Sequence, residues 1–236
     1  MSFVLIKNIP NYLTIVNLAS GVSALLLIFK GEFHWVFICL LISLVADLLD
    51  GLMARLLNAT GPLGVQLDSL ADLVSFGVMP AVFLFAILDN QGLSPTETYT
   101  IAASSLFYAA SAAWRLAKFN ITEDTKGDFF GLPSPAAGLF LMSYSYLMIS
   151  ESVWPFDHVF SGPMLAVALG IFMLLSLRFA SLKFSSAGHL SNLYRYAIIL
   201  LCPLPILFWG LSAAFYSMVI YFIISILSNF FPLDKS

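Results

Sequence analysis

The sequence has little charge and almost no cysteine. Charged residues make up 10% of its 236 residues, whereas hydrophobic residues make up 60%. Soluble globular domains carry about 25% charged residues, so this composition excludes an ordinary soluble domain and indicates an integral membrane protein. Both cysteines, Cys39 and Cys202, lie in apolar runs. They are expected to pack as small hydrophobic residues, and no disulfide framework is implied.

Positive charge is also scarce. The 10 Lys and Arg residues are fewer than the 13 acidic residues and are scattered along the chain. Nucleic-acid binding needs basic residues gathered into a patch or stripe, so no nucleic-acid partner is expected. The N-terminal apolar run lacks a small-residue cleavage site, and we interpret it as the first membrane span.

Apolar runs of about 20 residues, the length that crosses a hydrocarbon core of about 30 Å, predict an all-α bundle of eight transmembrane helices. The chain shows no internal repeat, so a single transmembrane domain over residues 1–236 is expected. The predicted spans are 11–29, 33–57, 63–88, 97–117, 133–150, 161–178, 193–209 and 212–230. Only Trp209-Gly210-Leu211 separates the last two, which leaves seven spans with a re-entrant end as an alternative.

The distribution of Lys and Arg predicts the orientation, because these residues collect in cytoplasmic loops. In an eight-span arrangement only Lys30 falls on the opposite side, and both termini are cytoplasmic. The residues on the cytoplasmic side are Lys7, Arg55, Arg115, Lys118, Lys126, Arg178, Lys183, Arg195 and Lys235. The expected location is therefore the cell inner (cytoplasmic) membrane.

Four aspartates lie inside two neighbouring apolar spans. An Asp costs about 2.5–3.5 kcal/mol at the centre of a membrane helix, so four of them need a reason. At about 100° per residue, Asp47 and Asp50 share one helical face, and Asp68 and Asp72 share a face of the next helix. The break at 58–62 lets these helices run antiparallel, so the acidic faces meet and repel each other. One or two divalent cations would neutralise the cluster.

The types of side chain in the cluster limit which ion it would bind. Carboxylates without His or Cys favour Mg²⁺, Mn²⁺ or Ca²⁺ over zinc, and phosphate is a natural co-ligand of such ions. Gly51 and Gly64 lie on the same faces and leave space for a ligand, while Arg55 is one turn further along and could bind a phosphate. The alternative is a structural ion network of Arg55 with the four acids.

The spacing of these residues resembles the signature of the CDP-alcohol phosphotransferase family, with every fixed position filled. The pattern is Asp47-x-x-Asp50-Gly51-x-x-Ala54-Arg55, eight residues, then Gly64-x-x-x-Asp68-x-x-x-Asp72. The resemblance implies a membrane-embedded helical bundle that binds two divalent cations and a CDP-linked alcohol, transfers the substituted phosphoryl group to an acceptor hydroxyl and releases CMP.

The same resemblance implies residue roles. Asp47, Asp50, Asp68 and Asp72 are the expected metal-binding set, and Asp72 is also the expected general base for the acceptor hydroxyl. The expected CDP-binding residues are Gly51, Ala54, Arg55 and Gly64. Homodimers are common in the family, which makes a homodimer the expected assembly.

Four stretches outside the signature resemble the phosphatidylserine synthase branch of the family. They are Ile9–Asn17, Asp68–Ala81, Arg115–Asn120 and Phe130–Ala137. This branch joins CDP-diacylglycerol to L-serine and gives phosphatidylserine and CMP. The alternative is the same chemistry with glycerol 3-phosphate or an inositol phosphate as acceptor.

An amino-acid acceptor carries a carboxylate, which an Arg can bind at two points. Arg115, Lys118 and Asn120 are grouped at the cytoplasmic end of one span and are candidates for this contact, although residues at a helix end are often basic for topology alone. Ser134 is a further candidate for the serine pocket, or else only starts its helix.

Thr14 and Asn17 are polar residues in the first span. They either line the same cavity as the acceptor or form interhelical hydrogen bonds.

Two other classes of function are alternatives to an enzyme. A cation channel or transporter would use the acids as a permeation site, but the cluster lies beside a single cytoplasmic turn. A structural membrane protein would leave the four aspartates without a role.

Overall fold

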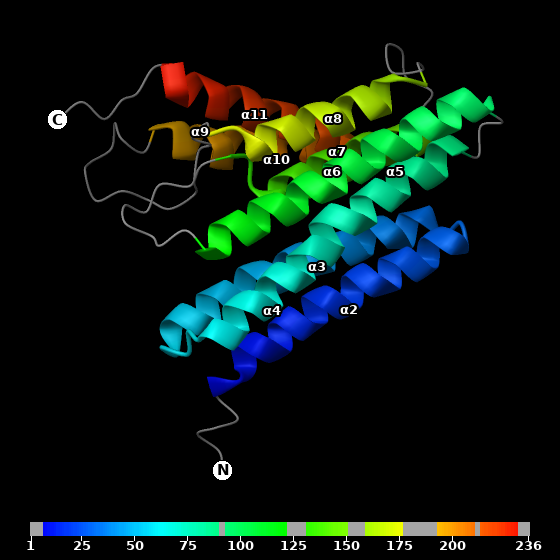
Figure 1. Cartoon of the computed structure of the whole chain (residues 1–236). Coiled ribbons are helices and arrows are strands. Elements are labelled where there is room, and N and C mark those ends of the chain that lie inside the picture. Colours follow the sequence, from blue (N-terminus) through cyan, green and yellow to red (C-terminus); the bar gives the residue numbers. More distant parts are fainter. Residues whose placement is uncertain are drawn as a thin grey trace.

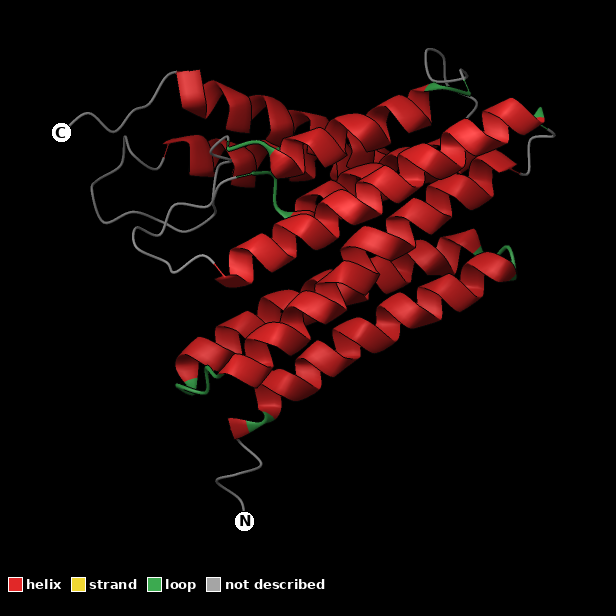
Figure 2. Cartoon of the chain, viewed as in Figure 1, coloured by secondary structure: helices red, strands yellow, loops and turns green. Residues whose placement is uncertain are grey.

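The computed structural model describes residues 7–89, 93–121, 131–150, 159–176, 193–210 and 213–230. These residues form helices joined by short loops, and no strand occurs among them (Figure 2). The helices are α2 (Ile9–Phe29), α3 (Phe33–Leu56), α4 (Pro62–Asp72), the π-helix η1 (Leu73–Val78), α5 (Met79–Asp89), α6 (Pro95–Ile121), α7 (Ser134–Ser150), α8 (Ser161–Leu174), α9 (Leu193–Leu201), α10 (Pro203–Trp209) and α11 (Ala214–Phe230). They lie side by side as a bundle (Figure 1).

The observed helices follow the predicted spans closely, with one correction. The span predicted over 193–209 is not one continuous helix, because α9 ends at Leu201 and α10 starts at Pro203. Pro203 has no N–H and cannot continue the hydrogen-bond ladder of α9. After Gly210, which has a φ of 77°, α11 packs against both α9 and α10. The chain therefore reverses there, which favours eight spans over seven.

The bundle has the surface of a membrane protein. Three helical stretches of the described residues are long and apolar enough to cross a membrane, namely Ile9–Phe29, Phe33–Leu56 and Pro62–Asp89. Large apolar side chains such as Leu48 and Leu106 are about 70% exposed (69% and 71%), which is unfavourable in water and favourable against lipid tails. The protein is an all-helical polytopic membrane protein.

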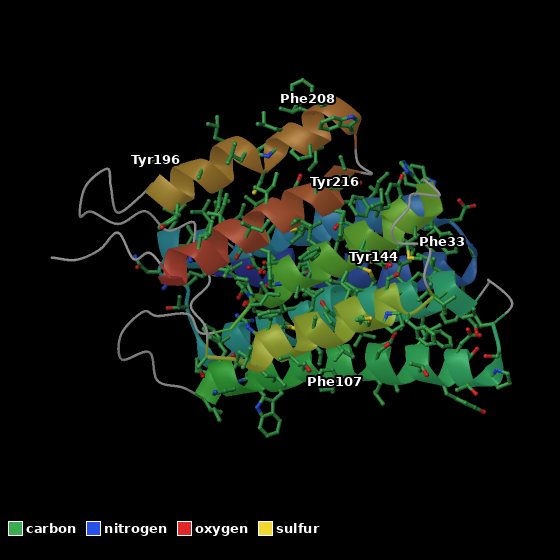
Figure 3. All side chains as sticks on the ribbon, turned by 90° about the horizontal axis from the view of Figure 1, so that it is seen from above. Phe33, Phe107, Tyr144, Tyr196, Phe208 and Tyr216 are labelled. Carbon is green, nitrogen blue, oxygen red and sulfur yellow. The ribbon has the colours of Figure 1, made fainter. Side chains whose placement is uncertain are left out.

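The interior of the bundle consists of two apolar clusters. One gathers around Tyr108 and Tyr144, and the other around Phe37 and Phe76. In the view from above, Tyr144 lies among the inner helices, whereas Phe208 lies at the outer edge on α10 (Figure 3). The clusters leave the polar residues of α2, α3 and α4 together at one end of the bundle.

Helix α2 organises that end, because it packs closely against both α3 and α4. The turn between α3 and α4, the start of α2 and the end of α11 all lie at the same end of the bundle (Figure 1). This arrangement agrees with the prediction that both termini lie on the same side of the membrane. Of the residues used to predict the orientation, Lys126, Arg178, Lys183 and Lys235 lie outside the described residues.

Candidate active site

Three aspartates from two helices bring their carboxylates together. Asp47 and Asp50 on α3 and Asp68 on α4 each offer an oxygen, and these atoms all lie within 4.8 Å of one another. The turn that allows this begins with Asn58 in the left-handed region, with a φ of 47°, and ends with Pro62 at the start of α4, where a missing N–H costs nothing. The predicted meeting of the two acidic faces is confirmed.

The surroundings of these carboxylates fit a hard metal ion. Asp50 is 4% exposed and Asp68 Oδ1 is buried without a hydrogen-bond partner. Like charges this close repel each other, and a buried carboxylate oxygen without a partner is costly. Oxygen ligands of this kind suit Mg²⁺, Mn²⁺ or Ca²⁺. The cluster of three aspartates can therefore bind a metal.

Asp72 is held differently from the other three. It lies one turn after Asp68 at the end of α4, is 7% exposed, and its Oδ1 accepts a 3.1 Å hydrogen bond from Asn17 Nδ2. It does not belong to the group of carboxylates within 4.8 Å, although the charges of Asp47 and Asp68 act on it.

Thr14 supports the cluster from α2. Its hydroxyl lies 2.7 Å from Asp50 Oδ2 and 3.0 Å from the carbonyl of Pro10. A hydroxyl has one proton and donates to one of them at a time. Thr14 shows both of the roles proposed for it, because it hydrogen-bonds to Asp50 on another helix and also lines a cavity beside the carboxylates. Asn17 forms an interhelical hydrogen bond to Asp72 and is not among the residues that line this cavity.

A cavity of about 100 Å³ adjoins the carboxylates. A Cβ at Gly51 would meet only Arg55 Nη1, at 4.0 Å, and a Cβ at Gly64 would lie 3.3 Å from Asn11 Oδ1. Both glycines therefore keep the cavity open, as predicted from the space they leave. The residues that line it are Pro10, Asn11, Thr14, Asp50, Gly51, Ala54, Ala59, Thr60, Gly61, Gly64, Val65 and Asp68.

Two observations on this cavity differ from the sequence reasoning. Asn11 lines it but was not among the candidate site residues, although the stretch 9–17 that contains it resembles the family. Arg55 is exposed and is not among the lining residues. Within the described part of the chain Arg55 forms no ion pair with the aspartates, which speaks against the structural ion network.

The structure brings Arg115 and Ser134 together. Arg115 Nη1 on α6 donates a 3.2 Å hydrogen bond to Ser134 Oγ at the start of α7, and Arg115 Nε is buried without a partner. The charge of Asp72 attracts the guanidinium. An arginine with a buried donor that has no partner can bind an anionic group.

The other two predicted acceptor residues lie apart from this pair. Asn120 Oδ1 accepts a 3.0 Å hydrogen bond from Ser69, and Asn120 Nδ2 donates to Gln66 at 3.3 Å. Asn120 thus links the end of α6 to α4. Lys118 is exposed near the same end of α6.

Comparison with known proteins places this geometry in a family. The family model of the CDP-alcohol phosphatidyltransferases matches residues 7–182. A CDP-diacylglycerol–serine O-phosphatidyltransferase of Methanocaldococcus jannaschii is 31% identical over 174 residues, covering 74% of each chain.

Bacterial relatives carry the same name. One from Helicobacter pylori J99 is 32% identical over 184 residues, which cover 74% of this chain and 72% of the relative. One from Bacillus subtilis is 32% identical over 167 residues, which cover 62% of this chain and 89% of the relative. With three aspartates of the signature gathered together and the family model matched over most of its length, this chain belongs to the CDP-alcohol phosphatidyltransferase family.

Proposed function

We propose that this enzyme transfers the phosphatidyl group of CDP-diacylglycerol to the hydroxyl of L-serine and produces phosphatidylserine and CMP. The observation that carries the proposal is the meeting of Asp47, Asp50 and Asp68 within 4.8 Å beside a cavity kept open by two glycines. The names of the relatives support serine as the acceptor.

Each part of the site has a role in this reaction. Asp47, Asp50, Asp68 and Asp72 would hold the divalent cations, two Mg²⁺ or Mn²⁺ ions, or Ca²⁺. Bound there, such ions stabilise the negative charge of the pyrophosphate during phosphoryl transfer. Gly51, Ala54 and Gly64 leave room for the CDP group, and Arg55, whose Nη1 would lie 4.0 Å from a Cβ at Gly51, would contact a phosphate.

Proton removal falls to Asp72. The serine oxygen forms a bond to the phosphorus that carries diacylglycerol, the bond from that phosphorus to CMP breaks, and the hydroxyl proton passes to the Asp72 carboxylate. Asn17 holds this carboxylate at 3.1 Å. A carboxylate is a weak base for an alcohol, so proton transfer is expected late and concerted with attack.

Arg115 and Ser134 are the proposed contacts for the carboxylate of serine. The two side chains are hydrogen-bonded to each other, and a guanidinium binds a carboxylate through paired hydrogen bonds. Lys118 and Asn120 are proposed at the rim, where Lys118 attracts anionic substrates and Asn120 joins α6 to α4.

An acceptor panel tests this function. Membranes that contain the chain receive CDP-diacylglycerol, Mn²⁺ or Mg²⁺, and labelled serine, glycerol 3-phosphate or inositol phosphate. We expect labelled lipid and CMP with serine. Strong turnover with glycerol 3-phosphate and none with serine would refute the acceptor, while ion flux into liposomes without a lipid product would refute the enzyme class.

The orientation and assembly are part of the proposal. We place the enzyme in the cell inner membrane as one catalytic domain, a homodimer with the active site and both termini towards the cytoplasm. The distribution of Lys and Arg along the sequence supports this orientation. Labelling of single cysteines in intact cells and a crosslinking assay in membranes test these two points.

A further inference from the structure

The helix that carries Asp68 and Asp72 changes its geometry directly after Asp72. Residues Leu73–Val78 form a π-helix, in which the N–H of Met79 donates to the carbonyl of Val74, five residues earlier. Pro80 explains the change, because it has no N–H to offer the carbonyl of Phe76, its α-helical partner. Short π-helical turns inside α-helices occur frequently at functional sites.

Other helices hold this turn in place. The hydroxyl of Tyr108 on α6 donates a 2.8 Å hydrogen bond to the carbonyl of Phe76. It thereby satisfies the acceptor that Pro80 leaves without its α-helical donor. From α7, Gly138 approaches so closely that a Cβ there would lie 3.0 Å from the Phe76 backbone. The π-helical segment Leu73–Val78, called the π-turn below, is therefore held in place by α6 and by α7.

The π-turn is also connected to the side chain of Asp72, through Ser75 and Asn17. Ser75 Oγ donates a 3.0 Å hydrogen bond to the backbone carbonyl of Asn17, which also accepts one from Ser43 at 3.2 Å. The side chain of Asn17 in turn donates to Asp72 Oδ1. Asn17 is 0% exposed, so water does not compete for these bonds. One buried residue thus joins α2, α3, the π-turn and the Asp72 carboxylate.

We infer that Tyr108 and Ser75 are positioning residues, which act through the π-turn and Asn17 to fix the Asp72 carboxylate relative to the other three aspartates. Neither lies among the residues that line the cavity. This inference rests on the proposed role of Asp72 as the base. A misplaced base slows the chemical step more than it weakens the binding of either substrate.

Two hydroxyl deletions with matched controls test it. Tyr108→Phe and Ser75→Ala remove the two hydrogen bonds that hold the π-turn. The controls are Tyr144→Phe, whose hydroxyl contacts Ser161 between α7 and α8, and Ser145→Ala, whose hydroxyl bonds within its own helix to Leu141. For each purified protein we would measure kcat, both KM values, Mn²⁺ affinity by titration, and Tm.

We expect kcat to fall about tenfold or more in Tyr108→Phe and Ser75→Ala, with KM values within about twofold of the wild type. Mn²⁺ binding at Asp47, Asp50 and Asp68 should be retained, because these three carboxylates remain in place, and only the part that Asp72 contributes as a ligand should weaken. Equal kcat in Tyr108→Phe and Tyr144→Phe would overturn the inference. So would a complete loss of Mn²⁺ binding, because it would mean that the cluster of three aspartates had itself collapsed.

The acceptor that the wild type uses distinguishes a failure of this inference from a failure of the proposed function. If the wild type uses an acceptor other than serine, the proposed acceptor fails, and the four variants are compared with the acceptor that it does use. If Ser75→Ala folds and Tyr108→Phe does not, the comparison of Ser75→Ala with Ser145→Ala decides.

Discussion

The hydroxyl of Thr14 lies 2.7 Å from Oδ2 of Asp50, a contact that joins α2 to α3 across 36 residues of sequence. It gives a buried carboxylate of the metal cluster one fixed hydrogen bond and so restricts its orientation. Ligands held by such supporting bonds typically lose about 10–100-fold in metal affinity when the support is removed.

Thr14→Val should therefore weaken Mn²⁺ binding by about tenfold. Valine has the same shape as threonine but lacks the hydroxyl, so packing against Pro10 stays intact. Thr14→Ser, which keeps the donor, is the matched control and should bind Mn²⁺ nearly as the wild type does. Equal affinity in Thr14→Val and Thr14→Ser, measured by titration, would contradict the supporting role.

Removal of divalent ions should abolish turnover. The carboxylates of Asp47, Asp50 and Asp68 then repel one another without compensation. EDTA should stop release of CMP, and added Mn²⁺ or Mg²⁺ should restore it. Asp68→Asn, which removes one of the three charges, should raise the Mn²⁺ concentration needed for half-maximal rate. Full activity in EDTA would argue against a metal-dependent reaction.

Asp72→Asn should abolish turnover without loss of folded protein. The amide has the shape of the carboxylate but cannot take up the proton of the acceptor hydroxyl. Radiolabelled serine incorporation measures the activity, and Tm measured alongside reports on folding. Unchanged turnover in this variant would remove Asp72 from the role of base.

Arg115→Lys should raise the KM for serine by about tenfold, which corresponds to about 1.4 kcal/mol, and leave the KM for CDP-diacylglycerol unchanged. Lysine keeps the positive charge but cannot form the paired hydrogen bonds of a guanidinium. Ser134→Ala removes the partner that orients Nη1 and should act in the same direction. A rise confined to the KM for CDP-diacylglycerol would instead assign Arg115 to the lipid substrate.

The variant Gly51→Ala should affect stability and substrate binding in opposite directions. Its new Cβ meets no protein atom closer than 4.0 Å, and alanine in a helix interior is about 1 kcal/mol more favourable than glycine. The Tm should therefore rise slightly. The same Cβ projects into the cavity beside Asp50, so the KM for CDP-diacylglycerol should increase. A variant with raised Tm and unchanged KM would show that the substrate does not occupy this space.

Much of the architecture was predictable from the sequence because the bilayer imposes simple constraints. Apolar runs of membrane-spanning length predicted the helices, and the periodicity of Asp47, Asp50, Asp68 and Asp72 predicted two facing acidic stripes. The interruption at Cys202 was missed, since an apolar run looks the same whether or not Pro203 breaks it. The missing N–H of Pro203 would have indicated that break.

Composition and the spacing of the aspartates predicted a polytopic membrane protein with four candidate metal-binding residues, because a carboxylate is costly in a membrane and its spacing on a helix is regular. The packing of the helices then showed how those residues are held. It gathers three aspartates within 4.8 Å and keeps Asp72 apart on Asn17, and it sets Arg115 against Ser134. The hydrogen bonds of Asn17 to Asp72 and of Arg115 to Ser134 join different helices, so no pattern within one helix predicts them.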